Sequence, residues 1–285
     1  MKEKEMGGRI KTTESSFRKS VNILLPFLIY FAVHDVAQVL LIFLVNIGMV
    51  SWGAFGKLIE ENRATVNGLI NALSLSIGMA AVWPMAHREL KWAKVWMGEG
   101  NRKKGNYVLL IIIAASFALG VNMLFVLLGL TGVSESYQEV ARRQYGVAFG
   151  AGLLIYGVIS PLAEETVFRG LIYNRMRRYF GRAISVIACG IMFGVYHGNL
   201  VQGIYGCILG IAITWSYESY GSFLAPVLFH SMANGAVFVA GYDGIVKGNI
   251  VTPLNCAALL GISVLGFAAL QFMRRRADGY NGGQQ

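Results

Sequence analysis

The sequence predicts an all-α, polytopic membrane protein with about eight transmembrane helices. Hydrophobic residues make up 55% of the 285-residue chain, and charged residues make up only 14%. The apolar residues are gathered in long blocks, and a helix of about 20 apolar residues is long enough to cross a bilayer. These blocks are continuous and lack the alternating pattern of barrel strands, so they favour helices. No remaining stretch is long enough for a separate soluble domain, and we expect one membrane domain.

Eight apolar runs are candidates for the spans. They are residues 21–46, 64–83, 107–130, 146–163, 183–198, 200–217, 222–241 and 251–273. The second run is only weakly apolar, and the fifth and sixth are short and rich in glycine, so these three give the weakest signals. We divide the chain into a tail (1–20), a group of N-terminal transmembrane helices (21–140), a catalytic helical core (141–273) and a second tail (274–285).

The positions of lysine and arginine predict the orientation of the chain. Most of these side chains fall before Ser20, in segments 84–106 and 174–182, and at the C-terminus, which lie on one side if every run spans the bilayer. By the positive-inside rule that side is the cytoplasm. We therefore expect a multi-pass protein of the cell membrane with both termini cytoplasmic. The net charge of +10 reflects this orientation, so we expect the lipid bilayer and no nucleic acid as a partner.

The second cationic segment has the pattern of an amphipathic helix. Its cations alternate with large apolar residues at helical spacing: Arg88, Lys91 and Lys94 with Trp92, Val95 and Trp96. Tryptophans at this position typically anchor a helix in the membrane interface. We predict an interfacial helix here, with a docking site for an anionic partner as the alternative.

The first apolar run contains a polar island formed by His34, Asp35 and Gln38. Ionisable residues within a membrane span can form proton or ion paths. Adjacent helical residues point about 100° apart, and no second acidic span continues such a path. These observations favour a structural His34–Asp35 pair over a relay.

Three motifs in the second half of the chain carry groups that are suited to catalysis. They are Glu164-Glu165 with Arg169, Phe193 with His197, and His230 with Asn234. Carboxylates at membrane depth are costly, so the glutamate pair is by itself a functional-site hypothesis. One motif alone would favour a bland interpretation, with the glutamates as loop charges beyond a shorter span and the histidines as packing residues.

Counting residues from the expected turns places the three motifs at compatible depths. A turn near Gly181 lies 16 residues after Glu165 and 16 residues before His197, roughly 24 Å along each helix. A second turn near Gly221 brings the third motif to a comparable depth, about 14 to 20 Å from that turn. We therefore expect the motifs to meet in one interior layer, which favours a functional site.

The spacing also separates the roles of the two glutamates. Glu165 and Arg169 are four residues apart with the acid first, which favours an ion pair along one helix face. Glu164 points about 100° away, and we assign it as a general base. His197 would share the activated water or shuttle its proton. Hydrogen bonds from His230 and Asn234 would stabilise an oxyanion, and this set of groups suits hydrolysis of an amide.

Zinc is the one cofactor that the residues suggest. If a metal is present, its ligands would be Glu164, His197 and His230. The chain has no His-Glu-x-x-His helix. The sequence does not distinguish a metal-bound water from one held by Glu164 and His197, and we favour the metal-free form. A weaker functional alternative is a proton-coupled transporter that uses Asp35 and Glu164.

The three motifs resemble the signature of the CPBP family of CAAX proteases and bacteriocin-processing enzymes, also called the Abi family. That signature is Glu-Glu-x-x-x-Arg, then Phe-x-x-x-His, then His-x-x-x-Asn or Asp, and the motif residues named above match it in order. The resemblance spans roughly residues 145–240 and implies a CAAX-protease-like helical bundle of eight helices.

This resemblance implies an intramembrane endopeptidase that acts on a membrane-associated peptide or protein. Glu164 and His197 would activate water, and His230 and Asn234 would form the oxyanion hole. Family members have been described both as metalloproteases and as glutamate-type proteases. The alternative that the family suggests is a non-catalytic immunity or scaffold protein directed against a bacteriocin-like peptide.

Overall fold

The structure is a computed structural model that describes residues 15–97, 106–242 and 250–282. All regular secondary structure within these ranges is helical, as the sequence predicts. The elements in chain order are α1 (Ser16–Ser51), α2 (Gly53–Glu61), α3 (Arg63–Met97), α4 (Tyr107–Leu127), α5 (Glu135–Tyr145), α6 (Phe149–Leu154), the π-helical turn η1 (Ile155–Ile159), α7 (Ser160–Val167), the π-helical turn η2 (Phe168–Tyr173), α8 (Asn174–Phe180), α9 (Arg182–Tyr196), α10 (Leu200–Tyr220), α11 (Leu224–Gly241) and α12 (Pro253–Gly282).

The chain is an all-α polytopic membrane protein. Within the described residues, seven helical segments are long and apolar enough to cross a bilayer: α1, α3, α4, the continuous segment Phe149–Phe180, α10, α11 and the first part of α12. Helix α9 is apolar but has only 15 residues. Each of the eight predicted runs therefore corresponds to a helix, and α9 is too short to meet the criterion for a span.

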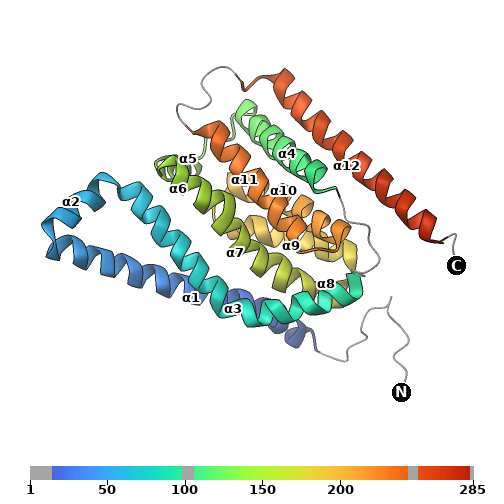
Figure 1. Cartoon of the computed structure of the whole chain (residues 1–285), viewed down its shortest axis with the longest axis horizontal. Coiled ribbons are helices and arrows are strands. Elements are labelled where there is room, and N and C mark those ends of the chain that lie inside the picture. Colours follow the sequence, from blue (N-terminus) through green and yellow to red (C-terminus); the bar gives the residue numbers. More distant parts are fainter. Residues whose placement is uncertain (1–14, 98–105, 243–249, 283–285) are drawn as a thin grey trace.

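The helices form two packed groups that share a central layer. In Figure 1, α1 and α3 lie side by side and are joined at their far ends by α2, whereas α4 and α12 lie together at the opposite side. The segment from α6 to α8 and helices α9 to α11 lie between them. One hydrophobic core, which includes Tyr30, Phe168 and Phe193, packs α1 and α3 against α7 to α9. A second core, which includes Leu110 and Phe229, packs α4 and α12 against α10 and α11.

The predicted separate interfacial helix does not exist as an independent element. Helix α3 runs without interruption from Arg63 to Met97 and contains Pro84 in its interior, which membrane helices tolerate more readily than soluble ones do. In its last part Trp92 and Val95 are exposed, as are the cations beside them, while Glu89 and Ala93 are buried. The prediction of a helix here is confirmed, but the helix is a continuation of the span; its place in the membrane interface stays a prediction.

The fourth span was predicted to end at residue 163, but the helical segment continues to Phe180. It can do so because the cations of segment 174–182 form ion pairs with buried carboxylates. Arg175 and Arg178 both pair with Glu89 of α3. On the other side of α8, Arg177 and Arg182 pair with Glu218 of α10, at 3.0 and 3.3 Å. A buried carboxylate needs such partners to stay charged. These pairs let α8 remain helical and tie it to α3 and α10.

The glycines of the fifth and sixth runs have a packing role. A Cβ atom at Gly206 would lie 3.1 Å from Cα of Gly194, and one at Gly210 would lie 3.0 Å from Cα of Gly190. The backbones of α9 and α10 are therefore in direct contact, as is common where membrane helices pack through small residues. This contact brings the end of α9, where His197 lies, against α10.

Two glycines with positive φ form the turns from which the depths of the three motifs were predicted. Gly181 (φ 76°) separates α8 from α9, and Gly221 (φ 64°) follows α10. Glycine adopts this conformation without the steric cost that a side chain would add. Both hairpins are confirmed at the predicted positions.

The two predicted tails are described only in part. Residues 1–14 and 283–285 lie outside the described ranges. The second tail, predicted for 274–285, begins as a continuation of α12, which ends at Gly282. The orientation of the termini and the division of the chain at residue 141, which falls within α5, stay predictions.

Candidate active site

The glutamate pair lies on a short α-helix between two π-helical turns. Helix α7 carries Glu164 and Glu165, η1 precedes it and η2 follows it, and the three elements form one continuous helical segment. A π-helical turn has a wider ring of backbone atoms, and such turns are frequent at functional sites. The two turns change the direction in which side chains leave the segment on either side of the pair.

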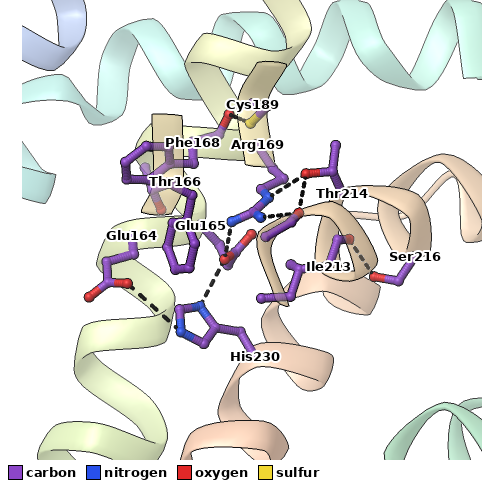
Figure 2. Close-up of polar contacts among 12 residues, drawn as sticks. Glu164, Glu165, Thr166, Phe168, Arg169, Cys189, Ile213, Thr214, Ser216 and His230 are labelled. Carbon is purple, nitrogen blue, oxygen red and sulfur yellow. Dashed lines mark hydrogen bonds and ion pairs between the residues drawn. The ribbon is translucent and has the colours of Figure 1, made fainter. Parts of the chain in front are cut away.

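Glu165 and Arg169 form the predicted ion pair, and both side chains are fully buried. The distance from Nη1 of Arg169 to Oε1 of Glu165 is 2.6 Å. Arg169 also donates to Oγ1 of Thr214 at 3.2 Å and to the Gly210 carbonyl at 2.8 Å, and its guanidinium lies 4.8 Å from the centre of the Phe193 ring. Figure 2 shows this arrangement, in which the guanidinium is enclosed between α7 and α10. The charge of Glu165 is therefore matched inside the bundle.

His230 of α11 joins the pair from the other side. Its Nδ1 lies 2.8 Å from Oε1 of Glu165, and its Nε2 lies 3.1 Å from Nδ2 of Asn234 (Figure 2 shows the first contact). A carboxylate accepts hydrogen bonds, so Nδ1 carries the proton and Nε2 of the neutral ring accepts one from the Asn234 amide. Both ring nitrogens are then engaged. In this arrangement His230 has no free N–H for an oxyanion and instead orients Asn234.

Glu164 lies apart from this buried set and lines a cavity of about 380 Å³ together with His197 and Asn234. Its Oε2 is 3.8 Å from Nε2 of His230, which is too long for a hydrogen bond, and within the described chain this buried oxygen has no hydrogen-bond partner. A buried carboxylate oxygen without a protein partner is a natural site for a water molecule.

His197 follows the last residue of α9 and lines the same cavity. Its Nδ1 lies 2.8 Å from the Phe193 carbonyl oxygen. Because that carbonyl accepts the Nδ1 proton, the neutral ring has Nε2 left as an acceptor. The structure thus places Glu164, His197 and Asn234 from the three motifs against a single cavity. Glu165, Arg169 and His230 lie behind them.

Sequence reasoning missed most of the remaining cavity wall. Polar side chains outside the three motifs form part of it, beside tyrosine and apolar side chains: His34, Asn71, Asn122, Thr131, Ser160 and Gln202. In the sequence, His34 belongs to the polar island, and Asn71 belongs to a stripe of small and polar residues that indicates helix packing. The others are single polar residues in apolar helices or loops, and their alignment depends on how the helices pack.

The donor groups do not fit a preformed zinc site. Among the residues that the structure describes, no three His, Cys, Asp or Glu side chains are arranged to hold one metal ion. Of the three predicted ligands, His230 already uses both ring nitrogens, and only Nε2 of His197 is free. We therefore derive no chemical step through a metal.

Residues 146–236, which contain all three motifs, match the family model described as Type II CAAX prenyl endopeptidase Rce1-like. This match confirms the resemblance to the CPBP family. The Rce1-like segment covers α6, η1, α7, η2 and α8 to α10, together with the part of α11 that carries His230 and Asn234.

A curated relative matches a shorter part of the chain. It is the UPF0177 protein YxdF of Lactococcus lactis subsp. lactis (strain IL1403), which is 27% identical over 81 residues. The aligned part covers 28% of this chain and 44% of that protein, so the chain spans less than half the length of the relative it matches. No solved structure gives a significant match.

Proposed function

We propose that this protein is an intramembrane endopeptidase that hydrolyses a peptide bond of a membrane-associated protein or peptide. One observation carries the proposal. Glu164, which has a buried carboxylate oxygen without a protein partner in the described chain, lines a cavity together with His197 and Asn234. The Rce1-like match over residues 146–236 supports an enzyme of the protease type.

The two acceptor groups suit the activation of a water molecule. Glu164 and Nε2 of His197 would each accept one hydrogen of a water between them, which directs a lone pair of that water towards the cavity. As the water oxygen attacks the carbonyl carbon of the substrate, its proton passes to the Glu164 carboxylate. The C–N bond then breaks, and Glu164 returns the proton to the leaving amine nitrogen.

Asn234 would stabilise the negative charge on the attacked carbonyl oxygen. Its amide nitrogen carries two protons, and one of them is used by Nε2 of His230. The second is available to an oxyanion at the cavity. His230, which is held by Glu165, fixes the direction of this amide, and a donor that is held in place before the reaction is what makes an oxyanion hole effective.

The position of the cavity suggests the class of substrate. Helices that cross the membrane surround it, so a substrate that is itself held at the membrane reaches it most directly. The name of the matching family includes prenylated CAAX substrates. The cavity wall contains both apolar and polar side chains, so the test compares a prenylated with an unprenylated peptide.

The test is cleavage by the purified protein in proteoliposomes that contain one of two peptides. One is a farnesylated peptide that ends in a CAAX sequence, and the other is an unprenylated peptide with a single transmembrane anchor. In H₂¹⁸O we expect mass spectrometry to detect two fragments of at least one peptide, with ¹⁸O in the new carboxyl terminus. If the protein binds the peptides and cleaves neither, the non-catalytic immunity or scaffold function replaces this proposal.

A further inference from the structure

His34 of α1, which belongs to none of the three motifs, lines the same cavity as Glu164, His197 and Asn234. Its Nδ1 lies 2.9 Å from Oδ1 of Asp35. Its Nε2 is buried and has no hydrogen-bond partner among the residues that the structure describes. Two imidazoles therefore line the cavity, His197 from the Rce1-like segment and His34 from the N-terminal helices. In both, Nδ1 forms a hydrogen bond to another protein group.

The packing of α1 places His34 at the depth of Glu164. Near the start of α1, Oδ1 of Asn22 accepts a hydrogen bond from Arg175 of α8 at 3.1 Å. His34 lies 12 residues after Asn22 in α1, and Glu164 lies 11 residues before Arg175 in the antiparallel segment. At 1.5 Å per residue, these separations are about 18 and 16 Å. The rings of Phe27 and Phe168, 6.0 Å apart, confirm the contact between the two segments midway.

The surroundings of His34 hold its ring in one position. Gly78 of α3 provides the space, because a Cβ atom there would lie 3.2 Å from Cβ of His34 and 3.1 Å from the Tyr30 ring. The Tyr30 ring stacks on the imidazole with a centroid distance of 6.1 Å and an interplanar angle of 20°. The side chain of His34 is only 13% exposed. A buried polar side chain that is fixed in this way, with a nitrogen left without a partner, is suited to bind a ligand in the cavity.

Asp35 determines which nitrogen of His34 is available. Its carboxylate accepts the Nδ1 proton, so the neutral imidazole presents Nε2 as a hydrogen-bond acceptor. An unfolded peptide segment within the membrane exposes backbone N–H groups that have no water to bind, and each of them needs an acceptor. In the proposed mechanism Glu164 and His197 are occupied by the water, and Asn234 acts as a donor. Nε2 of His34 is an acceptor in the cavity wall that the proposed mechanism does not use.

We propose that His34, oriented by Asp35, is a substrate-binding residue that accepts a hydrogen bond from a backbone N–H of the peptide beside the scissile bond. This inference rests on the proposed function. It makes α1 part of the substrate-binding site, although α1 lies outside the segment that matches the protease family.

The first test separates binding from chemistry. Two variants are compared in proteoliposomes: Glu164→Gln alone, and Glu164→Gln combined with His34→Ala. For each, we measure the affinity for the farnesylated CAAX peptide and for the anchored peptide. Because His34→Ala removes one hydrogen bond, the double variant should bind the peptide about five- to tenfold more weakly than the single variant. In the otherwise intact enzyme, His34→Ala should raise KM by a similar factor with kcat nearly unchanged. His34→Gln, which retains an acceptor, should restore much of the affinity.

His87 provides a matched control, because it is an exposed histidine near Trp83 on α3, outside the cavity wall. His87→Gln should change neither KM nor affinity. If the enzyme cleaves a peptide and His34→Ala leaves KM and affinity unchanged, the inference is wrong and the proposed function stands. If no peptide is cleaved, the proposed function is wrong, and the binding measurement still decides whether His34 holds a peptide.

A spectroscopic measurement tests the role of Asp35 without any substrate. The chain has four histidines, so ring ¹⁵N signals of the full-length protein in nanodiscs can be assigned with single His→Gln variants. We expect His34 to carry its proton on Nδ1, and we expect Asp35→Ala to abolish that preference. A proton on Nε2 in the unmodified protein would overturn the inference, because Nε2 would then be a donor.

Discussion

Nδ1 of His230 lies 2.8 Å from Oε1 of Glu165, so a buried hydrogen bond ties α11 to α7. The same oxygen is bound by Arg169. Glu165 is thus a fully buried acceptor. It binds Arg169 from its own helical segment and His230 from a different hairpin. This relationship explains why a pair of adjacent glutamates can have two roles: the second organises the site, and the first is left to face the cavity.

Arg169→Met should destabilise the protein strongly. It removes the cation that matches the charge of Glu165 and leaves a buried carboxylate with only His230 as a partner. Breaking a buried ion pair by removing one member typically costs about 3–5 kcal/mol. We expect a decrease of this size in the free energy of unfolding, measured by denaturant titration in detergent micelles.

The chain offers a matched control for this substitution. Arg143 and Glu139 on α5 have the same four-residue spacing, but both side chains are exposed. Arg143→Met should reduce the free energy of unfolding by less than about 1 kcal/mol. Equal effects of the two substitutions would show that the buried pair has no special role.

Gly206→Ala should impair the site through His197. A Cβ atom at this position would lie 3.2 Å from Nδ1 of His197 and 3.1 Å from Cα of Gly194, so the ring or the helix must move. Small displacements of reacting groups have large effects on rate, and we expect peptide cleavage to slow by about 10- to 100-fold. The measurement is the cleavage rate in proteoliposomes, with thermal unfolding to confirm that the variant folds.

Gly235→Ala is the control for Gly206→Ala, since Gly235 follows Asn234 and has open space around it. It should leave the cleavage rate nearly unchanged. If Gly206→Ala folds and cleaves at the normal rate, then the position of His197 does not matter for the reaction.

Asn234→Ala should lower kcat with little change in KM. The amide is proposed to bind the oxyanion, which exists only in the transition state, and loss of one such donor typically costs about 10²- to 10³-fold in kcat. Steady-state kinetics on the cleaved peptide measure this effect. Asn62→Ala, which changes an exposed asparagine at the end of α2, serves as the reference. A rise in KM alone would assign Asn234 to substrate binding instead.

Peptide cleavage should survive removal of metal ions. The predicted ligand His230 has both nitrogens engaged, and in the described structure the acidic and histidine side chains form no three-ligand group. We expect the same rate after dialysis against EDTA or 1,10-phenanthroline, and no increase on addition of Zn²⁺. Loss of activity that Zn²⁺ restores would require a rearranged site with metal-bound water.

Much of this fold follows from the sequence because its signals are local. Continuous apolar runs predict helices, and the glycines at positions 181 and 221 predict turns. With both known, a rise of 1.5 Å per residue is enough to bring the three motifs to one depth. The Glu165–Arg169 pair is also a local feature, since both residues lie on one helical segment.

The features that the sequence did not predict depend on contacts between distant segments. Helix α8 extends to Phe180 because Glu89 and Glu218, far away in the chain, accept its cations. His230 binds Glu165 instead of facing the cavity, and this depends on how α11 packs against α7. His34 reaches the cavity through the packing of α1 against α3 and against the segment from α7 to α8, which no motif in the sequence encodes.

In the proposed mechanism, Glu164 activates the water that attacks the substrate. The most direct measurement is the rate of ¹⁸O-labelled fragment formation by Glu164→Gln, a substitution that keeps the size of the side chain and removes the base. We expect cleavage to fall by about 10²- to 10⁴-fold while peptide binding and thermal stability stay close to those of the unmodified protein. Glu139→Gln, at an exposed position, should cleave normally. A Glu164→Gln protein that folds and still cleaves at the original rate would contradict this mechanism.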